Sequence, residues 1–586
     1  MNDRLDSVVP RPTSVRALPG AFPLTARTPV TTAHRPGPPD DGAARAAAAV
    51  RQVLARLPWP DDAPDTSHGA ASHQADHQIT VEVTSHLPEE AYRLTITPAD
   101  VSIVAGGAPG AFYAAQTLRQ LLPDTAWRAA PAPSTTNAPD AAVPWHLPCA
   151  EIVDTPALAW RGAHLDVARH FTTKRELLTL IDAFAALKLN RLHLHLTDDQ
   201  GWRIESKRYP ALHEIGSHRE RTRISLNREQ PPVYDETPHG GYYSLADLSE
   251  ISAYAARQMI TVVPEIEVPG HASALLAALP QFGAGTPPAG GYQVLGDWGI
   301  FPYLMSPLPQ TGAFLREIFT ELLEAVPSPY VHIGGDECVL DSWRDDPQVD
   351  AYRAGRGLAG PAELHAVFLR EVADMIADDF GARAVVWDEG FASTGGQRGL
   401  LRPDTIVMAW RGMEIAQRAA EAGHDVIASP VLPTYFDYYQ SDDDNEPAGI
   451  GGPIRLADVA AFAPVPANWP EDARRRLIGT QLQVWTEYIR NGRELEYMIF
   501  PRAVALADVA WSGGPATDDA QPARLAAHLR RLDAAGVEYR PLAGPRPGQA
   551  GGTGPRRHRA GARIQDVAAR LDRLAADEEH AAAQRA

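Results

Sequence analysis

From residue 160 onward, eight short apolar segments alternate with amphipathic helical patterns, and this alternation constrains the fold more than any other feature. Short apolar strands separated by helices are typical of βα units and a parallel sheet. The expected strands lie at 160–166, 191–196, 260–265, 330–335, 383–388, 405–410, 425–429 and 480–485. Eight strands are the number in a closed (β/α)8 barrel, so we predict an α/β fold of the TIM-barrel type.

The helix after the first expected strand illustrates the pattern. Thr173 and Glu176 have the spacing of a capping box. Behind them, one apolar stripe is formed by Leu177, Leu180, Ile181, Phe184 and Leu187. In such barrels the chemistry takes place at the carboxyl ends of the strands, so functional residues are expected just after each one.

The chain divides into four regions. Residues 1–40 are rich in Pro and Thr and are expected to be irregular, whereas residues 41–150 predict a smaller α/β domain that ends in a long loop or linker at 123–148. The barrel is expected over 151–540. Residues 541–586 predict a flexible linker and a C-terminal helix, which could dock on the protein, mediate self-association or stay loosely ordered.

Composition excludes several classes of partner. The chain has 54 basic and 73 acidic residues, a net charge of −19, which argues against a nucleic-acid partner. Its two cysteines are too few for a disulfide framework or a thiolate metal cage. No apolar run suited to a signal peptide or a membrane span is visible, so we expect a cytoplasmic protein without a membrane partner.

A strand-like run that begins at Val331 passes through Gly334 and Gly335 and ends on Asp336 and Glu337. Neighbouring carboxyl groups push their pKa values apart, because the first negative charge opposes the second. One group can then donate a proton to a leaving oxygen while the other stabilises positive charge on a sugar. The glycines allow backbone and ligand to approach closely.

Five motifs follow one another in the order of a known family. They are RGAHLDVARHF at 161–171, HLTDDQGWR at 195–203, VPGH at 268–271, HIGGDE at 332–337 and VWTE at 484–487. Together they resemble the family 20 glycoside hydrolases, the β-N-acetylhexosaminidases, from about Glu151 to Ser512. The resemblance implies an exo-acting, retaining hydrolase of small carbohydrate substrates, with a non-catalytic domain before the barrel and no cofactor or metal.

The same resemblance implies substrate-assisted catalysis, in which the 2-acetamido oxygen of the sugar attacks the anomeric carbon. Glu337 would then be the general acid and base, and Asp336 would hold the acetamide nitrogen. Tyr435 would donate a hydrogen bond to the acetamide carbonyl.

Further matching positions would bind the sugar itself. Arg161 is expected to donate hydrogen bonds to two adjacent hydroxyl groups of the sugar. Asp437 and Glu487 are expected to accept hydrogen bonds from other hydroxyl groups. The expected walls of the pocket are Trp387, Trp410 and Trp485.

Three more residues are expected to act through Glu337 rather than on the sugar. Asp198 and His271 would hydrogen-bond toward Glu337 and adjust its pKa. Glu267 stands where the family usually has Asp, so it is a weaker candidate.

Two alternatives remain open from the sequence. His193 and His195 share one face of a strand and could bind metal in a metal-dependent hydrolase. A non-catalytic sugar-binding protein could also keep this fold.

Overall fold

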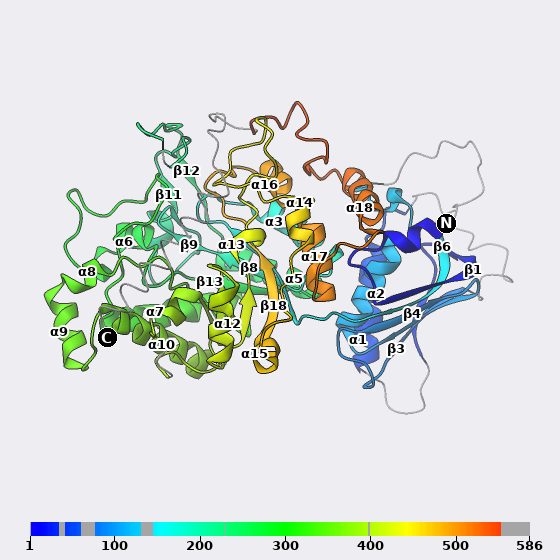
Figure 1. Cartoon of the computed structure of the whole chain (residues 1–586), viewed down its shortest axis with the longest axis horizontal. Coiled ribbons are helices and arrows are strands. Elements are labelled where there is room, and N and C mark those ends of the chain that lie inside the picture. The colour runs from blue at the N-terminus through cyan, green and yellow to red at the C-terminus, as the bar shows by residue number, and fades with distance from the viewer. Residues whose placement is uncertain are drawn as a thin grey trace.

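The chain forms a smaller sheet domain and a barrel, shown in the computed structural model of Figure 1. The structure describes residues 2–33, 41–59, 77–130, 145–227, 229–395 and 399–552. The expected C-terminal helix, and with it the proposed surface for self-association, lies outside these residues. No helix within the described ranges is long and apolar enough to cross a membrane.

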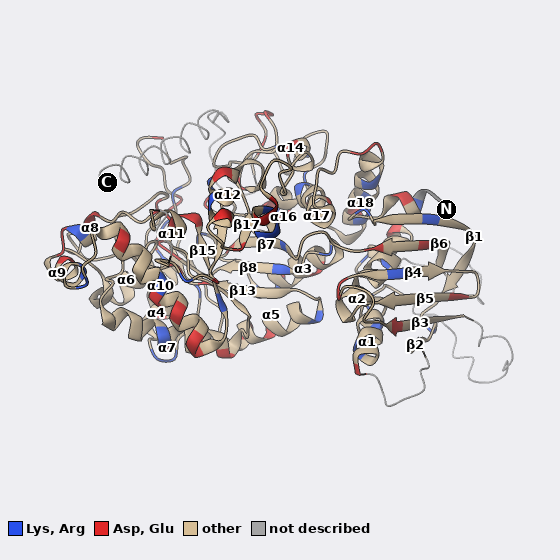
Figure 2. Ribbon diagram, turned by 60° about the horizontal axis from the view of Figure 1, so that its bottom comes forward, with Lys and Arg blue, Asp and Glu red and all other residues tan. Residues whose placement is uncertain are grey.

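The smaller domain is built on a six-stranded mixed sheet with the order β1-β6-β4-β5-β3-β2. Its strands are β1 (Ser14–Leu24), β2 (Val30–Thr32), β3 (Gln78–Val83), β4 (Tyr92–Ile96), β5 (Asp100–Ala105) and β6 (Trp145–Asp154). Helices α1 (Asp41–Ala55) and α2 (Ala108–Gln120) lie between this sheet and the barrel in both views (Figures 1 and 2). Two 3-10 turns, η1 (Asn2–Ser7) and η2 (Asp124–Trp127), complete the domain.

The prediction of an irregular segment over residues 1–40 is wrong for β1. This strand pairs antiparallel with β6, and its register shifts between Ala17 and Ala21. The shift accommodates Pro19 and Gly20, residues that argue against a regular strand but are tolerated at an edge or a bulge. Because β6 continues to Asp154, the smaller domain also ends slightly later than predicted.

All eight predicted barrel strands are present. They are β7 (Trp160–Asp166), β8 (Arg191–His195), β13 (Thr261–Glu265), β14 (Tyr330–His332), β15 (Arg383–Trp387), β16 (Ile406–Ala409), β17 (Val426–Ala428) and β18 (Leu477–Leu482). They close into one parallel barrel with the order β13-β14-β15-β16-β17-β18-β7-β8. This closure brings every carboxyl end of a strand to the same rim.

Amphipathic helices surround the barrel. Thr173 caps α3 (Lys174–Ala186) in the predicted capping box with Glu176. The other main helices are α5 (Leu245–Arg257), α7 (Pro309–Ala325), α10 (Pro361–Phe380), α12 (Met413–Glu421), α15 (Glu471–Arg476), α16 (Gly492–Ile499), α17 (Arg502–Ser512) and α18 (Gln521–Ala535). Since their apolar faces pack on the strands, the barrel is covered except at its ends.

Short elements lie in the loops between these helices and strands. They are α4 (Ala211–Glu214), α6 (Ser273–Ala278), η3 (Pro280–Phe282), α8 (Asp341–Arg344), α9 (Pro347–Gly355), α11 (Asp388–Ala392), α13 (Val431–Thr434), α14 (Leu456–Ala460), and the two-stranded ladders β9 (Thr197–Asp198) with β10 (Gly201–Trp202) and β11 (His218–Arg219) with β12 (His239–Gly240). The residues after α18 are also ordered in part, because Gln549 is buried and donates to the carbonyl oxygen of Tyr539.

Buried charges join the smaller domain to the amino-terminal end of the barrel. Lys188 lies 2.9 Å from a carboxylate oxygen of Asp154, and both side chains are fully buried. Trp511 of α17 donates to the other oxygen of Asp154 at 2.8 Å. These contacts attach the smaller domain to the barrel at the end opposite the rim.

Candidate active site

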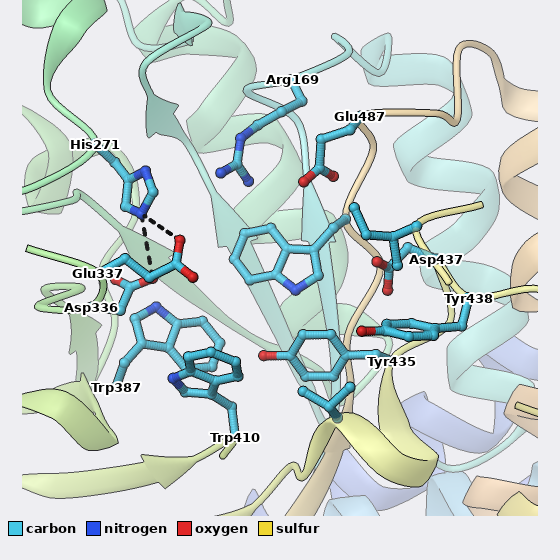
Figure 3. A pocket seen from close by; sticks show the side chains of 13 residues that line it. Arg169, His271, Asp336, Glu337, Trp387, Trp410, Tyr435, Asp437, Tyr438 and Glu487 are labelled. Carbon is cyan, nitrogen blue, oxygen red and sulfur yellow. Dashed lines mark ion pairs between the residues drawn. The ribbon is translucent and has the colours of Figure 1, made fainter. Parts of the chain in front are cut away.

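A pocket opens at the carboxyl ends of the barrel strands (Figure 3). It is lined by Arg169, His271, Asp336, Glu337, Trp387, Trp410, Val431, Tyr435, Asp437, Tyr438, Ile450, Trp485 and Glu487. Nine of the twelve site residues predicted from the sequence are among them. The expectation that functional residues follow the strands and the family motifs therefore indicate the same pocket.

The loop after β14 presents the two carboxyl groups. Gly334 and Gly335 have φ angles of 61° and 98°, which L-residues with a side chain rarely adopt. A Cβ on Gly334 would lie 1.8 Å from an oxygen of Glu267, so only glycine fits there. Glu337 itself has a φ of 49°, and this unusual backbone turns its side chain toward the pocket (Figure 3).

His271 places a positive charge beside both carboxyl groups. Its Nε2 lies 3.6 Å from Asp336 and 3.7 Å from Glu337, as the dashed lines of Figure 3 show. Burial opposes the charge of this ring, but Asp198 and its neighbours raise the pKa of His271 well above its usual value. The histidine is therefore cationic at neutral pH and stabilises the anion of the pair.

Asp198 lies directly behind this arrangement. It is fully buried and contacts His271 Nδ1 at 3.4 Å and Arg169 Nη2 at 2.6 Å. Burial would raise the pKa of Asp198, but Arg169 and His271 hold it far below its usual range. Asp198 is thus a fixed anion that orients two cations of the pocket.

The structure corrects the expectation for Arg161. Its side chain is buried at the amino-terminal end of β7, where both of its Nη atoms donate to Glu90 of the smaller domain at 2.8 and 2.9 Å. It also donates to Tyr113 of α2. Arg161 therefore joins the two domains and does not line the pocket.

Arg169 supplies the arginine of the pocket instead, a residue that the sequence analysis missed. It follows β7 by three residues, and its Nε donates to Gln200 at 3.0 Å. Its guanidinium lies 5.0 Å from the ring centre of Trp485. Functional residues of such barrels follow the carboxyl ends of strands, and this favours Arg169 from the sequence. Arg161 lies near the start of β7, whereas Arg169 lies beyond its end.

Three tryptophans form the apolar walls. Trp387 and Trp485 have ring centres 5.9 Å apart, and Trp410 stacks at 6.3 Å against Tyr435. The indole of Trp410 is held by Glu389, to which it donates at 2.8 Å. Flat indole faces of this kind suit the C–H faces of a sugar ring.

Tyr435, Asp437 and Glu487 occupy the other side of the pocket in Figure 3. Burial raises the pKa of Tyr435 well above its usual value, so its hydroxyl is a neutral donor. Burial, and then Glu487, raise the pKa of Asp437 well above the ordinary carboxyl range. Burial likewise raises the pKa of Glu487. These two carboxyl groups are poised to exchange hydrogen bonds with neutral hydroxyls.

Glu267 is buried behind the pocket and does not line it. Neither of its carboxylate oxygens has a hydrogen-bond partner in the described part of the chain. Burial, and then Asp336, raise the pKa of Glu267 well above its usual value. Glu267 therefore stands as a neutral acid behind Asp336.

His193 and His195, the expected metal ligands of the alternative hypothesis, do not line the pocket. They lie 3.1 and 2.5 Å from one oxygen of Glu265, which are hydrogen-bond distances. Two ligands at the usual Zn²⁺ distances of about 2.0–2.1 Å would be roughly 3.4 Å apart in a tetrahedral site. The geometry therefore favours a hydrogen-bonded cluster over a metal site.

Two adjacent carboxyl groups at the rim of a barrel, beside a pocket with tryptophan walls, define the class of protein as a barrel glycoside hydrolase. The family model of the glycosyl hydrolase family 20 catalytic domain matches residues 158–514, and that of domain 2 of the same family matches residues 6–155. The chain belongs to glycosyl hydrolase family 20.

Known proteins support this assignment. A beta-hexosaminidase of Porphyromonas gingivalis is 36% identical over 478 residues, which cover 81% of this chain but only 57% of that protein. A beta-N-acetylhexosaminidase of Cellulomonas fimi is 32% identical over 93% of this chain and 99% of its own length. Among solved structures, the GH20 exo beta-N-acetylglucosaminidase of Vibrio harveyi in complex with N-acetylglucosamine has a TM-score of 0.74 at 30% identity, covering 92% of this chain and 78% of that one.

Proposed function

We propose that the protein is an exo-acting β-N-acetylhexosaminidase that releases terminal N-acetylglucosamine or N-acetylgalactosamine from β-glycosides with retention of configuration. The observation that carries this proposal is the placement of Asp336 and Glu337 together, facing one pocket with tryptophan walls and sharing His271 as a counter-ion. The names of the relatives support the same activity.

In the first step, Glu337 donates its proton to the glycosidic oxygen while the bond from that oxygen to C1 breaks. The carbonyl oxygen of the substrate's own acetamide attacks C1 and closes an oxazolinium ring. Asp336 accepts a hydrogen bond from the acetamide nitrogen, and its charge stabilises the positive ring.

In the second step, Glu337 is a carboxylate and removes a proton from the attacking water. The water adds to C1 on the face that the leaving group has vacated, which reopens the oxazolinium ring and restores the acetamide. Two displacements at C1 give net retention. Every step is assigned to a side chain, to water or to the substrate, so the reaction uses no cofactor.

Tyr435 orients the acetamide. As a neutral phenol in a buried setting, it donates to the acetamide oxygen as that atom approaches C1. Trp387, Trp410 and Trp485 surround the acetamide and the ring, which keeps competing water away from the intermediate.

Arg169, Asp437 and Glu487 bind the hydroxyl groups at the far end of the sugar. Arg169 takes the role that the sequence analysis gave to Arg161, since its planar guanidinium suits two adjacent oxygens. These contacts suit the free hydroxyl groups of a terminal sugar, so the enzyme removes one terminal sugar at a time.

The leaving group extends into an adjoining cavity. This cavity shares Arg169, Glu337, Ile450 and Glu487 with the pocket, and its own residues are Gln200, Asn227, Trp298, Gly299 and Ile300. The cavity adjoins the side of Glu337, where the departing oxygen is protonated. It would hold the next sugar of an oligosaccharide.

A pair of aryl glycosides tests the proposal. The enzyme is expected to cleave an aryl N-acetyl-β-glucosaminide and to leave the matching β-glucoside, which lacks the acetamide, almost untouched. Cleavage of neither compound would indicate a binding protein, and equal cleavage of both would contradict assisted catalysis. Including the aryl N-acetyl-β-galactosaminide measures the sugar preference, which stays open together with the expected cytoplasmic location and self-association.

A further inference from the structure

Glu265, the last residue of β13, forms the centre of a buried cluster that lies outside the pocket. One oxygen accepts a hydrogen bond from Trp387 Nε1 at 3.0 Å and lies 2.7 Å from His332 Nδ1. The other lies 3.1 Å from His193 Nε2 and 2.5 Å from His195 Nδ1. These partners come from β15, β14 and β8, so a single carboxylate joins three neighbouring strands of the barrel to its own.

His195 connects this cluster to a second buried carboxylate. Its Nδ1 faces Glu265, and its Nε2 lies 2.8 Å from Asp198. Both neighbours accept hydrogen bonds, so both ring nitrogens carry a proton and the ring is cationic. Burial opposes this charge, but Glu265 and Asp198 raise the pKa of His195 to about 10.

The other ionisable neighbours of this ring do not share its charge. Gln481 donates to His193 Nδ1 at 3.1 Å, which leaves one proton for the bond to Glu265, and burial lowers the pKa of His193 to about 4. Burial also lowers the pKa of His164, whose ring centre is 5.8 Å from that of His195. Glu267, with an oxygen 3.8 Å from His195, is the neutral acid described above.

From Asp198 the connection continues into the pocket. Asp198 contacts Arg169 and His271, and His271 faces Asp336 and Glu337. Glu265 therefore reaches the pocket by two routes. It holds the indole of Trp387 directly, and it holds the catalytic carboxyl groups through His195, Asp198 and His271.

We propose that Glu265 is a positioning residue for the reaction, which fixes Trp387 as a pocket wall and keeps His195 charged so that Asp198 can orient Arg169 and His271. This inference deepens the proposed function and rests on it. A carboxylate inside an apolar barrel is costly unless it is fully paired, which explains why three histidines surround it.

The variant Glu265→Gln tests the proposal because it keeps the size of the side chain and removes its charge. His195 then faces one anion instead of two, so its pKa falls toward the ordinary histidine range near 6.5. Above that pH the ring loses its proton, and Asp198 loses a cation. Because Glu337 must be protonated to act as the acid, the native profile of kcat/KM already has an alkaline limb. In Glu265→Gln this limb is expected to move to lower pH, and the maximum is expected to fall roughly ten- to a hundredfold.

Asp154→Asn is the matched control. Asp154 is also fully buried, accepts from a tryptophan indole at 2.8 Å and pairs with a buried cation, but it lies at the opposite end of the barrel. Removing the charge of Asp154 is expected to lower the free energy of unfolding. The pH profile of kcat/KM of the folded variant is expected to keep its native shape. A shift of equal size in both variants would mean that the effect of Glu265 is only structural.

A titration of the histidine imidazoles by NMR in the ligand-free native enzyme completes the test and needs no variant to fold. The expected result is that His195 keeps both ring protons at pH 7 and His193 keeps one. A neutral His195, or a Glu265→Gln enzyme with the native pH profile, would overturn the proposal. A native enzyme that does not cleave the aryl N-acetyl-β-glucosaminide would refute the proposed function instead, and the titration would still decide the state of the cluster.

Discussion

Replacing Arg169 or Arg161 by lysine should have different effects, because the two arginines lie at opposite ends of the barrel. In the native protein, the planar guanidinium of Arg169 contacts Gln200, Asp198 and Asp166. The variant Arg169→Lys keeps a positive charge in the pocket but removes this planar group. A compact ammonium cannot hold these groups and two sugar hydroxyls at once. Hydrogen bonds from charged groups contribute about 1.5–3 kcal/mol each, so the loss of one or two predicts a kcat/KM lower by roughly a hundredfold.

Arg161→Lys is expected to act on stability instead. Arg161 donates to Glu90 through two nitrogens, and also to Tyr113 and to the carbonyl oxygens of Leu158 and Lys188. Lysine has three donors, so at least two of these five bonds are lost. At about 1.5–3 kcal/mol for each bond from a charged group, the free energy of unfolding should fall by about 3–6 kcal/mol. The kcat/KM of the folded enzyme should stay within about twofold of the native value, because no contact reaches the pocket.

Initial rates with an aryl N-acetyl-β-glucosaminide and denaturant unfolding of the same preparations measure both quantities. The expected pattern is a catalytic defect in Arg169→Lys and a stability defect in Arg161→Lys. The reverse pattern would refute the placement of both arginines. Since the chain has two domains, the unfolding curve should be followed by two probes, and the earlier transition is the one that Arg161→Lys should shift.

Four further predictions concern the reaction. Glu337→Gln should lower kcat/KM for a disaccharide by about 10²–10⁴-fold but much less for aryl glycosides whose leaving group needs no proton; equal losses of kcat/KM across a leaving-group series would contradict its role as the acid. Asp336→Asn should lower kcat for all of these substrates by about 10²–10³-fold, and near-normal turnover would exclude it as the stabilising anion. Tyr435→Phe should cost about 10²-fold in kcat with little loss of stability, as measured by steady-state kinetics and thermal unfolding. Ile300→Ala should lower kcat/KM severalfold for a disaccharide and leave the aryl glycoside unchanged, whereas equal effects on both would place the leaving group elsewhere.

The strands of the barrel could be predicted because their signal is local. Each is a short apolar run followed by a helix with its own cap, as Thr173 and Glu176 show. The first strand of the smaller domain was missed because Pro19 and Gly20 interrupt its pattern, and pairing with a partner over a hundred residues away overrides that signal.

Most of the pocket could also be predicted, because its residues lie in short motifs at the ends of strands. Arg161 was wrongly predicted to bind the sugar: it lies near the start of β7, and Arg169 of the same motif lies beyond the carboxyl end of that strand. Glu265 was missed for a different reason. Within an apolar strand it has no visible partner, and only the closed barrel brings three histidines and Trp387 around it.

Assisted catalysis requires the acetamide of the substrate to be the nucleophile. Aryl N-acetyl-β-glucosaminides whose acetamide carries zero, one, two or three fluorine atoms test this requirement. Each fluorine withdraws electrons from the carbonyl oxygen that attacks C1 while the leaving group stays the same. The value of kcat/KM is expected to fall steeply with every added fluorine. A kcat/KM that does not change across the four compounds would show that another group attacks C1 and would contradict substrate-assisted catalysis.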